Sequence, residues 1–406
     1  MKQIGVGTFK TTEKMRGLIN DVLTSERLSY GPYSREFENR FAEIHQCRYG
    51  VLSNSGTSSL QVALQALKEL RGWEDGDEVL IPSVTFVATA NIVLHNKMKP
   101  VLVDVDLSYY EMNPHILMKN YERLITNRTR AMIPVHLFGH PCDMTKLKGI
   151  AKEFKLAIIE DSCECMFVDC SGRMVGSWGD VGCFSTYIAH LLTTGVGGIA
   201  TTNDSELAVK MRSLVNHGRD GIYLSIDDDK NLNDKELKEV ISRRFNFESI
   251  GHSFRITELE SALAIAQLDD YKDMLIARAT NAAFLTMKLE ELKTFINLPK
   301  KRFDCGHAWM MYPIMCYGDE KKELTEYLEL HGVETRELLP LVNQPCYKGM
   351  WNPSDYKNAQ MIDKGGFYVG CHQDLTMDDL RTITKTIKDF YSIHRAEIMD
   401  KRRKNV

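Results

Sequence analysis

The chain has 406 residues, of which 43% are hydrophobic and 26% are charged, and its formal net charge at pH 7 is −4. These values are ordinary for a globular protein, and the small negative charge argues against a dedicated nucleic-acid or anionic-membrane binder. The length predicts two or three structural units. No apolar run has the form of a signal peptide or the length of a membrane span, so we expect a cytoplasmic protein.

Ten cysteines are spread along the chain. In a cytoplasmic protein we expect them to be buried thiols rather than a disulfide framework. Cys163, Cys165 and Cys170 lie close together, but their spacing does not match the common zinc or iron–sulfur patterns. The sequence therefore predicts no metal site.

The first two-thirds of the chain alternate helical and strand signals. Residues 58–70 (SSLQVALQALKEL) have the periodicity of an amphipathic helix. Short apolar runs that end in polar or turn residues predict strands, and helical stretches lie between several of them. This alternation is typical of an α/β fold in which helices cover a mostly parallel sheet. The predicted strands are Glu78–Ile81, Val101–Val103, Ala131–Val135 and Leu156–Ile159.

The carboxyl ends of these strands are the expected place for a ligand, because parallel sheets bind ligands at that edge. The segments that follow three of the predicted strands are therefore candidates for a binding site. They are Pro82–Thr89, His136–Gly139 and Asp161–Glu164.

The remainder of the chain predicts a smaller α/β unit. Residues 257–277 have the composition of one long helix, which Thr257 would cap and which would join the two units. A strand-like segment follows at 307–317, and helical segments follow at 321–332 and 376–393.

We therefore predict a large domain with an N-terminal arm at residues 1–255, and a linker helix with a small C-terminal domain at residues 256–406. The acidic, weakly apolar segment Asp220–Glu239 is expected to be an exposed excursion.

Three segments carry candidate chemistry. Ser53–Ser58 is a small polar run directly before a helix, where free N–H groups bind anions, although serines also serve as ordinary helix caps. Residues 158–164 (IIEDSCE) place Asp161 at the end of an apolar strand, where a carboxylate could pair with a protonated heterocyclic nitrogen or simply cap a helix. Residues 182–199 combine a serine, His190 and a glycine-rich turn.

The order and spacing of these segments resemble the DegT/StrS family of pyridoxal-phosphate (PLP)-dependent sugar aminotransferases, which are enzymes of fold type I. The resemblance covers nearly the whole chain. It implies a large domain with a mostly parallel mixed sheet covered by helices, and a smaller C-terminal α/β domain. The other matching motifs are Gly31–Ala42, Pro82–Asp106, Val135–Met144, Gly251–Leu268, Gly332–Pro340 and Gly370–Thr376.

The resemblance also implies a cofactor site. Phe86 matches the aromatic residue that stacks on the pyridine ring, the alternative being a core phenylalanine, and Asp161 matches the partner of the pyridine nitrogen. Glu164 lies where aminotransferases usually carry Gln, beside the 3′-oxygen. Ser253 lies where members usually present Asn to the cofactor phosphate of the neighbouring subunit, which implies a homodimer. The residues that match the phosphate-binding groups are Gly56, Thr57, Ser58 and Ser185.

His190 occupies the place of the lysine that forms a Schiff base with the cofactor. Imidazole cannot form that bond, but it can transfer protons near neutral pH. The same replacement occurs in a branch of the family, the NDP-4-keto-6-deoxyhexose 3-dehydratases, which hold pyridoxamine phosphate (PMP) noncovalently. Resemblance to this branch implies removal of the C3 hydroxyl from a nucleotide-linked 4-keto-6-deoxy sugar, with His190 as the base, an amino donor such as glutamate, and a role in deoxysugar and polysaccharide biosynthesis.

Glu164 also resembles this branch more than the aminotransferases, but other residues depart from it. Val196 replaces the Glu that is common before the glycine pair, and His190 stands alone where the dehydratases tend to carry two adjacent histidines. A related dehydratase branch uses an iron–sulfur cluster with cysteines downstream of its histidine, but no cysteine lies between Cys183 and Cys305. Two alternatives stay open: a nucleotide-sugar aminotransferase-like enzyme of unusual mechanism, and a catalytically inactive cofactor- or sugar-binding homologue.

Overall fold

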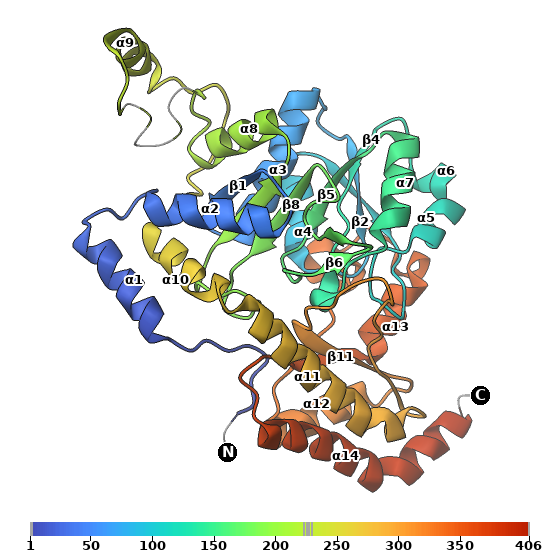
Figure 1. Ribbon diagram of the computed structural model, residues 1–406. Helices are drawn as coiled ribbons and strands as arrows, with labels where there is room; N and C mark the ends of the chain where they lie inside the picture. Colours follow the sequence, from blue (N-terminus) through green and yellow to red (C-terminus); the bar gives the residue numbers. More distant parts are fainter. Residues whose placement is uncertain (1–2, 222–223, 225–227, 229, 405–406) are drawn as a thin grey trace.

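The computed structural model describes residues 3–221, 224, 228 and 230–404. Within them, seven strands form the larger sheet, in the order β1-β9-β8-β5-β4-β2-β3 (Figure 1). Neighbouring strands are parallel, except that β9 is antiparallel to both β1 and β8. The strands are β1 (Tyr49–Ser53), β2 (Glu78–Pro82), β3 (Lys99–Val103), β4 (Thr129–Met132), β5 (Ala157–Asp161), β8 (Val181–Ser185) and β9 (Gly198–Thr202).

Both faces of this sheet are buried. Successive side chains of a strand point to opposite faces, so a strand buried along its length contributes to the core on both sides. On β5, Ala157 and Ile159 belong to one hydrophobic cluster, and Ile158 belongs to another on the opposite face. Helical residues join both clusters, with Leu64 in the first and Leu147 in the second, so the predicted α/β class is confirmed. The helices of this part of the chain are α1 (Glu13–Thr24), α2 (Pro32–Ile44), α3 (Gly56–Arg71), α4 (Val87–His95), α5 (Pro114–Lys119), α6 (Tyr121–Leu124), α7 (Met144–Phe154), α8 (Ser205–Val215), α9 (Asp234–Arg243) and α10 (Glu258–Leu268).

The predicted strands are present, with one early end. β4 stops at Met132 rather than at Val135, because Pro134 has no N–H to donate to a neighbouring strand. The pairing nevertheless continues in fragments: the Ile133 N–H donates to the carbonyl oxygen of Leu80 at 2.8 Å, and Val135 forms an isolated bridge with Asp161. The His136 segment is thereby kept beside the end of β5.

The predicted helix over 257–277 is wrong in one respect, because two helices take its place. Thr257 caps α10 as predicted: its side chain accepts the Leu259 N–H and forms a capping box with Glu260. The helix then ends at two consecutive aspartates, a residue type with low helix propensity. The first of them, Asp269, is held by ion pairs with Lys14 and Arg40, and α11 begins after the second.

A smaller sheet, in the order β10-β11-β13-β12, forms in the C-terminal part of the described chain. Figure 1 shows α11, α12 and α14 around it, with α11 running diagonally from the end of α10. Its hydrophobic cluster is built from residues 282–398 together with Ile4 of the N-terminal arm. The elements are α11 (Tyr271–Leu289), β10 (Ile296–Asn297), β11 (Met311–Cys316), α12 (Lys321–Leu330), β12 (Thr335–Glu337), α13 (Lys357–Gly365), β13 (Gly366–Gly370) and α14 (Met377–Lys404).

The acidic excursion lies partly outside the described residues, at 222–223, 225–227 and 229. The described remainder is mostly exposed at 230–239, and α9 projects away from the body of the molecule (Figure 1). In the part of the chain that the structure describes, no helix is long and apolar enough to cross a membrane.

One cysteine pair departs from the expectation of buried thiols. Cys170 and Cys305 form a disulfide across a sequence separation of 135 residues. Backbone pairing brings them together, because the Ser171 N–H donates to the Asp304 carbonyl at 2.8 Å and the Gly306 N–H donates to the Asp169 carbonyl at 2.7 Å. Cys170 lies on β6 (Asp169–Cys170), which forms a hairpin with β7 (Arg173–Met174).

Candidate active site

The three candidate segments meet at Gly56, the first residue of α3. A Cβ atom at this position would lie 2.6 Å from the Cβ of Ser185 and 2.7 Å from the Sγ of Cys163. Glycine is therefore required for the N-terminus of α3 to approach the ends of β5 and β8. The polar turn, the acidic strand end and the histidine-containing loop thus form one site.

The polar turn before α3 caps the helix with some of its residues and exposes another to solvent. Ser55 is the N-cap, and its hydroxyl accepts the Ser58 N–H at 3.1 Å. The Ser58 hydroxyl is buried and donates to the Asn54 side chain at 2.7 Å, whereas Thr57 is exposed. Capping therefore occupies Ser55 and Ser58. The helix N-terminus and the exposed Thr57 are suited to an anion such as a phosphate.

Asp161, the last residue of β5, is 5% exposed and firmly held. Its Oδ2 accepts the Thr89 hydroxyl at 2.8 Å, and its Oδ1 accepts the Cys163 N–H at 3.2 Å. Burial raises the pKa of Asp161, and the hydrogen bonds from Cys163 and Thr89 act in the opposite direction. Asp161 is not the N-cap of a described helix, so the capping alternative does not hold. A buried carboxylate of this kind is suited to a protonated ring nitrogen.

Glu164 lies one turn beyond Asp161. Its Oε2 accepts the backbone N–H of Phe138 at 2.8 Å. Burial raises the pKa of Glu164 to about 7, the Phe138 hydrogen bond lowers it, and the charge of Asp161 raises it further. Glu164 can therefore hold or release a proton close to neutral pH.

His190 lies in the loop between β8 and β9. Its Nδ1 is 3.2 Å from the carbonyl oxygen of Ser185, and because a carbonyl only accepts hydrogen bonds, Nδ1 carries the proton. The neutral ring therefore has its free lone pair on Nε2. Burial lowers the pKa of His190 to about 4, the Ser185 hydrogen bond raises it, and the positive charge of Arg278 lowers it. At neutral pH this side chain is an uncharged base.

The loop that carries His190 is braced at its base. The hydroxyls of Thr186 and Thr194 lie 2.6 Å apart, and the Thr186 N–H donates to the Gly197 carbonyl at 3.0 Å. From α10, the Gln267 side chain donates to the Thr193 carbonyl at 2.7 Å. These contacts close the loop as a compact unit, which limits the freedom of the imidazole.

Phe86 and Ser253 lie at the edge of the site. Phe86 follows β2 and is 56% exposed, so the alternative of a core phenylalanine does not hold. Ser253 is exposed, and its hydroxyl accepts from Arg255 at 3.0 Å. The carbonyl of the next residue, Phe254, accepts the Asn54 N–H at 2.7 Å, so the Ser253 segment runs beside the start of the polar turn.

Ser253 faces a cleft of about 800 Å³. The cleft is rich in arginine side chains, and a buried acid, Glu38, lies at its wall. The positively charged lining includes Arg35, Arg212, Arg219 and Arg255.

These residues fit a phosphorylated pyridine cofactor. The site has a helix N-terminus that the close approach at Gly56 brings against Ser185, a buried acid at Asp161 and an exposed aromatic side chain at Phe86. The DegT/DnrJ/EryC1/StrS aminotransferase family matches residues 10–388. The chain belongs to this family. PLP and PMP are the cofactor forms that such enzymes use, so the predicted cofactor is supported.

Members of the DegT/DnrJ/EryC1/StrS family with two different reactions are similar to this chain. GDP-perosamine synthase of Escherichia coli O157:H7 is 30% identical over 395 residues, which cover 97% of this chain and 100% of the relative. The dTDP-4-dehydro-2,6-dideoxy-D-glucose 3-dehydratase of Saccharopolyspora spinosa is 29% identical over 380 residues, covering 90% of this chain and 81% of the relative.

The solved structure of E. coli GDP-4-keto-6-deoxy-D-mannose-3-dehydratase with bound hydrated PLP matches the fold with a TM-score of 0.84. The match covers 95% of this chain and 100% of that chain at 22% identity, which supports the family fold and no finer statement. Sequence and fold therefore agree in placing the chain in the DegT/DnrJ/EryC1/StrS aminotransferase family.

His136 and Glu160 form a buried pair beside the site. The sequence placed His136 in a candidate binding segment, but this pairing was not predicted from it. The Nε2 of His136 lies 3.1 Å from the Oε2 of Glu160, and both side chains are fully buried. The sequence does contain a signal for such a pair: Glu160 lies directly before Asp161 at the end of an otherwise apolar strand. An acid that is buried at such a position needs hydrogen-bond partners.

Proposed function

We propose that this protein is a PMP-dependent 3-dehydratase that removes the C3 hydroxyl from a nucleotide-linked 4-keto-6-deoxy sugar. The observation that carries the proposal is the environment of His190. The residue stands where the family's covalent anchor is expected, its Nδ1 donates to Ser185, and its Nε2 lone pair is free. A neutral imidazole cannot anchor the cofactor covalently, but it can take up a proton.

PMP, when bound, supplies an amine for the C4 ketone of the sugar and an aromatic ring that accepts electrons. In the proposed site Asp161 would keep the ring nitrogen protonated, and Phe86 would cover one face of the ring. Gly56, Thr57 and Ser185 would hold the phosphate, and Ser58, whose N–H and hydroxyl donate to Ser55 and Asn54, would shape the turn that carries Thr57. His190 would take the proton from the C4′ carbon through Nε2 and return it to the C3 hydroxyl, which would leave as water.

Glu164 has a separate proposed role beside the 3′-oxygen of the cofactor. Its raised pKa of about 7 lets it share a proton with that oxygen. The Phe138 N–H fixes one carboxylate oxygen at 2.8 Å and leaves the other to face a ligand.

The aminotransferase alternative is favoured by a specific observation, the similarity to GDP-perosamine synthase over the whole length of that protein. Such a reaction would retain the C3 hydroxyl and leave an amine at C4. The third alternative, an inactive homologue, is opposed by the intact polar surroundings of Asp161 and by a histidine in a geometry fit for proton transfer.

We also propose a homodimer in which Ser253 contributes to the site of the partner subunit. Ser253 lies in the arginine-rich cleft, outside the cluster that surrounds Gly56. Closed two-fold dimers are the commonest oligomers. Sedimentation of the PLP-loaded protein at micromolar concentration should give a dimer, and a stable monomer with bound cofactor would contradict this proposal.

Mass spectrometry of the sugar product tests the reaction. The protein is incubated with PMP, glutamate and one of two sugars, GDP-4-keto-6-deoxymannose or dTDP-4-keto-6-deoxyglucose. A product that has lost the C3 oxygen and retains a C4 ketone supports the dehydratase. A product that retains the C3 hydroxyl and carries a C4 amine supports the aminotransferase, and no product with any 4-keto sugar supports the inactive homologue.

A further inference from the structure

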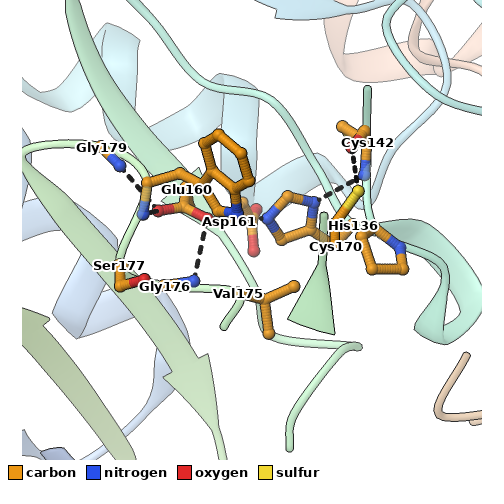
Figure 2. A network of polar contacts seen from close by, with 12 residues as sticks. His136, Cys142, Glu160, Asp161, Cys170, Val175, Gly176, Ser177 and Gly179 are labelled. Atoms are coloured by element: carbon orange, nitrogen blue, oxygen red, sulfur yellow. Dashed lines mark hydrogen bonds and ion pairs between the residues drawn. The ribbon is translucent and has the colours of Figure 1, made fainter. Parts of the chain in front are cut away.

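The side chain of Glu160, on β5, is fully buried and accepts four hydrogen bonds (Figure 2). Its Oε1 accepts the N–H groups of Trp178 at 2.6 Å and Gly179 at 2.8 Å. Its Oε2 accepts the Gly176 N–H at 2.8 Å and lies 3.1 Å from His136 Nε2. Four donors satisfy a buried carboxylate and fix its position in the core.

His136 joins this anchored carboxylate to a neighbouring turn. Its Nδ1 accepts the Cys142 N–H at 3.0 Å, so the proton of the neutral ring is on Nε2, which donates to Glu160. Figure 2 shows the imidazole between the two partners. Both ring nitrogens are therefore engaged, one with the end of β5 and one with the 137–142 segment.

The backbone on either side of His136 contacts both candidate acids. The His136 N–H donates to the Asp161 carbonyl at 3.0 Å, and the Asp161 N–H donates to the Pro134 carbonyl at 2.9 Å. Two residues beyond His136, the Phe138 N–H donates to the carboxylate of Glu164 at 2.8 Å. Phe138 reaches this position with a left-handed backbone, φ 58°.

We propose that His136 is a positioning residue for the cofactor site, and that its imidazole sets the relative placement of Asp161 and Glu164. This inference rests on the roles proposed above for the two acids. The imidazole ties the 137–142 segment, which carries the Glu164 partner, to the strand end that carries Asp161. The strength of a hydrogen bond between a carboxylate and a protonated ring nitrogen depends on its geometry. Loss of the His136 hydrogen bonds would therefore weaken cofactor binding although both acids are still present.

Two substitutions break the two links separately. The His136→Asn amide reaches as far as Nδ1 and can still accept from Cys142, but it does not reach Glu160. The His136→Gln amide can reach Glu160 but loses the Cys142 bond. His45→Asn is the control for loss of a buried imidazole, because His45 is also fully buried, with its Nδ1 2.8 Å from the Val175 carbonyl, and the described contacts of its ring include no hydrogen bond to Glu160 or Cys142.

The measurements are the absorbance band of bound PLP, the PLP dissociation constant and the melting temperature of the unliganded protein. We expect both His136 variants to shift the band in the same direction as Asp161→Asn does, and to weaken PLP binding by about 10-fold, the lower end of the effect of removing outer partners at metal sites. His45→Asn should lower the melting temperature and leave the band unchanged.

The outcomes separate this inference from the proposed function. If Asp161→Asn shifts the band and both His136 variants bind PLP with the wild-type band, His136 is only a structural brace and the inference is wrong. If Asp161→Asn itself leaves the band unchanged, the proposed cofactor contact of Asp161 is wrong. If neither His136 variant folds, His136 supports the core as a whole and the positioning role is overturned.

Discussion

The Nδ1 of His190 lies 3.2 Å from the backbone carbonyl of Ser185, the residue whose side chain is proposed to bind the cofactor phosphate. The last residue of β8 therefore orients the proposed base with its carbonyl, and the same residue is proposed to hold the cofactor phosphate with its side chain. Because this bond fixes the proton on Nδ1, the proton-accepting atom of His190 is Nε2.

His190→Asn should abolish turnover and spare binding. Asparagine preserves a hydrogen-bonding group of similar reach but cannot accept a proton at neutral pH. We expect kcat to fall by at least the roughly 10²–10⁴-fold typical of a general acid–base group, with little change in the PMP dissociation constant. Steady-state kinetics and PMP titration measure the two quantities. A variant that turns over the sugar at near the wild-type rate would show that some other group is the base.

His190→Lys should restore covalent attachment of the cofactor. The wild-type protein loaded with PLP and treated with borohydride should carry no pyridoxyl group, because imidazole cannot form the bond that borohydride reduces. The lysine variant should carry one, at position 190, by peptide mass spectrometry. A reduced adduct on a defined lysine of the wild-type chain would contradict the noncovalent site and favour the aminotransferase alternative.

The acid limb of kcat/KM should lie below pH 6.5. Burial lowers the pKa of His190 to about 4, so the imidazole stays neutral and active as a base while the pH falls through the range where an exposed histidine gains a proton. The same group makes the fold less stable in acid, because the unfolded chain takes up this proton near pH 6.5 and the folded chain does so only near its lowered pKa. Melting temperatures at each pH separate inactivation from unfolding, and an acid limb centred near pH 6.5 in the folded protein would contradict the prediction.

Reduction of the Cys170–Cys305 disulfide should destabilise the protein. The bond closes a long loop, with a sequence separation of 135 residues, and loss of such a crosslink costs about 2–4 kcal/mol of the free energy of unfolding. Dithiothreitol should therefore lower the melting temperature of the wild-type protein. The Cys170→Ser/Cys305→Ser double variant should melt at the lower temperature with or without dithiothreitol, and equal melting of oxidised and reduced wild type would contradict the prediction.

Local sequence signals were sufficient for most of the fold. The helix predicted over 58–70 is the body of α3, and the capping by Thr257 is present, because periodicity and capping act between residues that are close in the chain. The strand runs and the order of the family motifs predicted the α/β class and the meeting of the three candidate segments. The position of Asp161 at the ligand edge of the sheet followed from the same pattern.

Contacts between residues far apart in the chain decided what the sequence left open. The helix predicted over 257–277 divides at two consecutive aspartates, and the first of them, Asp269, pairs with Lys14 and Arg40 from the N-terminal part of the chain. The cysteine pairing depends on backbone hydrogen bonds between segments 135 residues apart. No local pattern carries the cysteine pairing or the partners of Asp269.

The chemistry of the site was decided in the same way. The sequence alone determined that a histidine replaces the expected lysine and that an acid ends β5. The tertiary structure decided which nitrogen of His190 is free and how far burial lowers the pKa of that side chain. It also decided how His136 links Asp161 to Glu164. The physical reason is that the proton affinity and the orientation of a side chain are set by the groups packed around it, and folding brings those groups from distant parts of the chain.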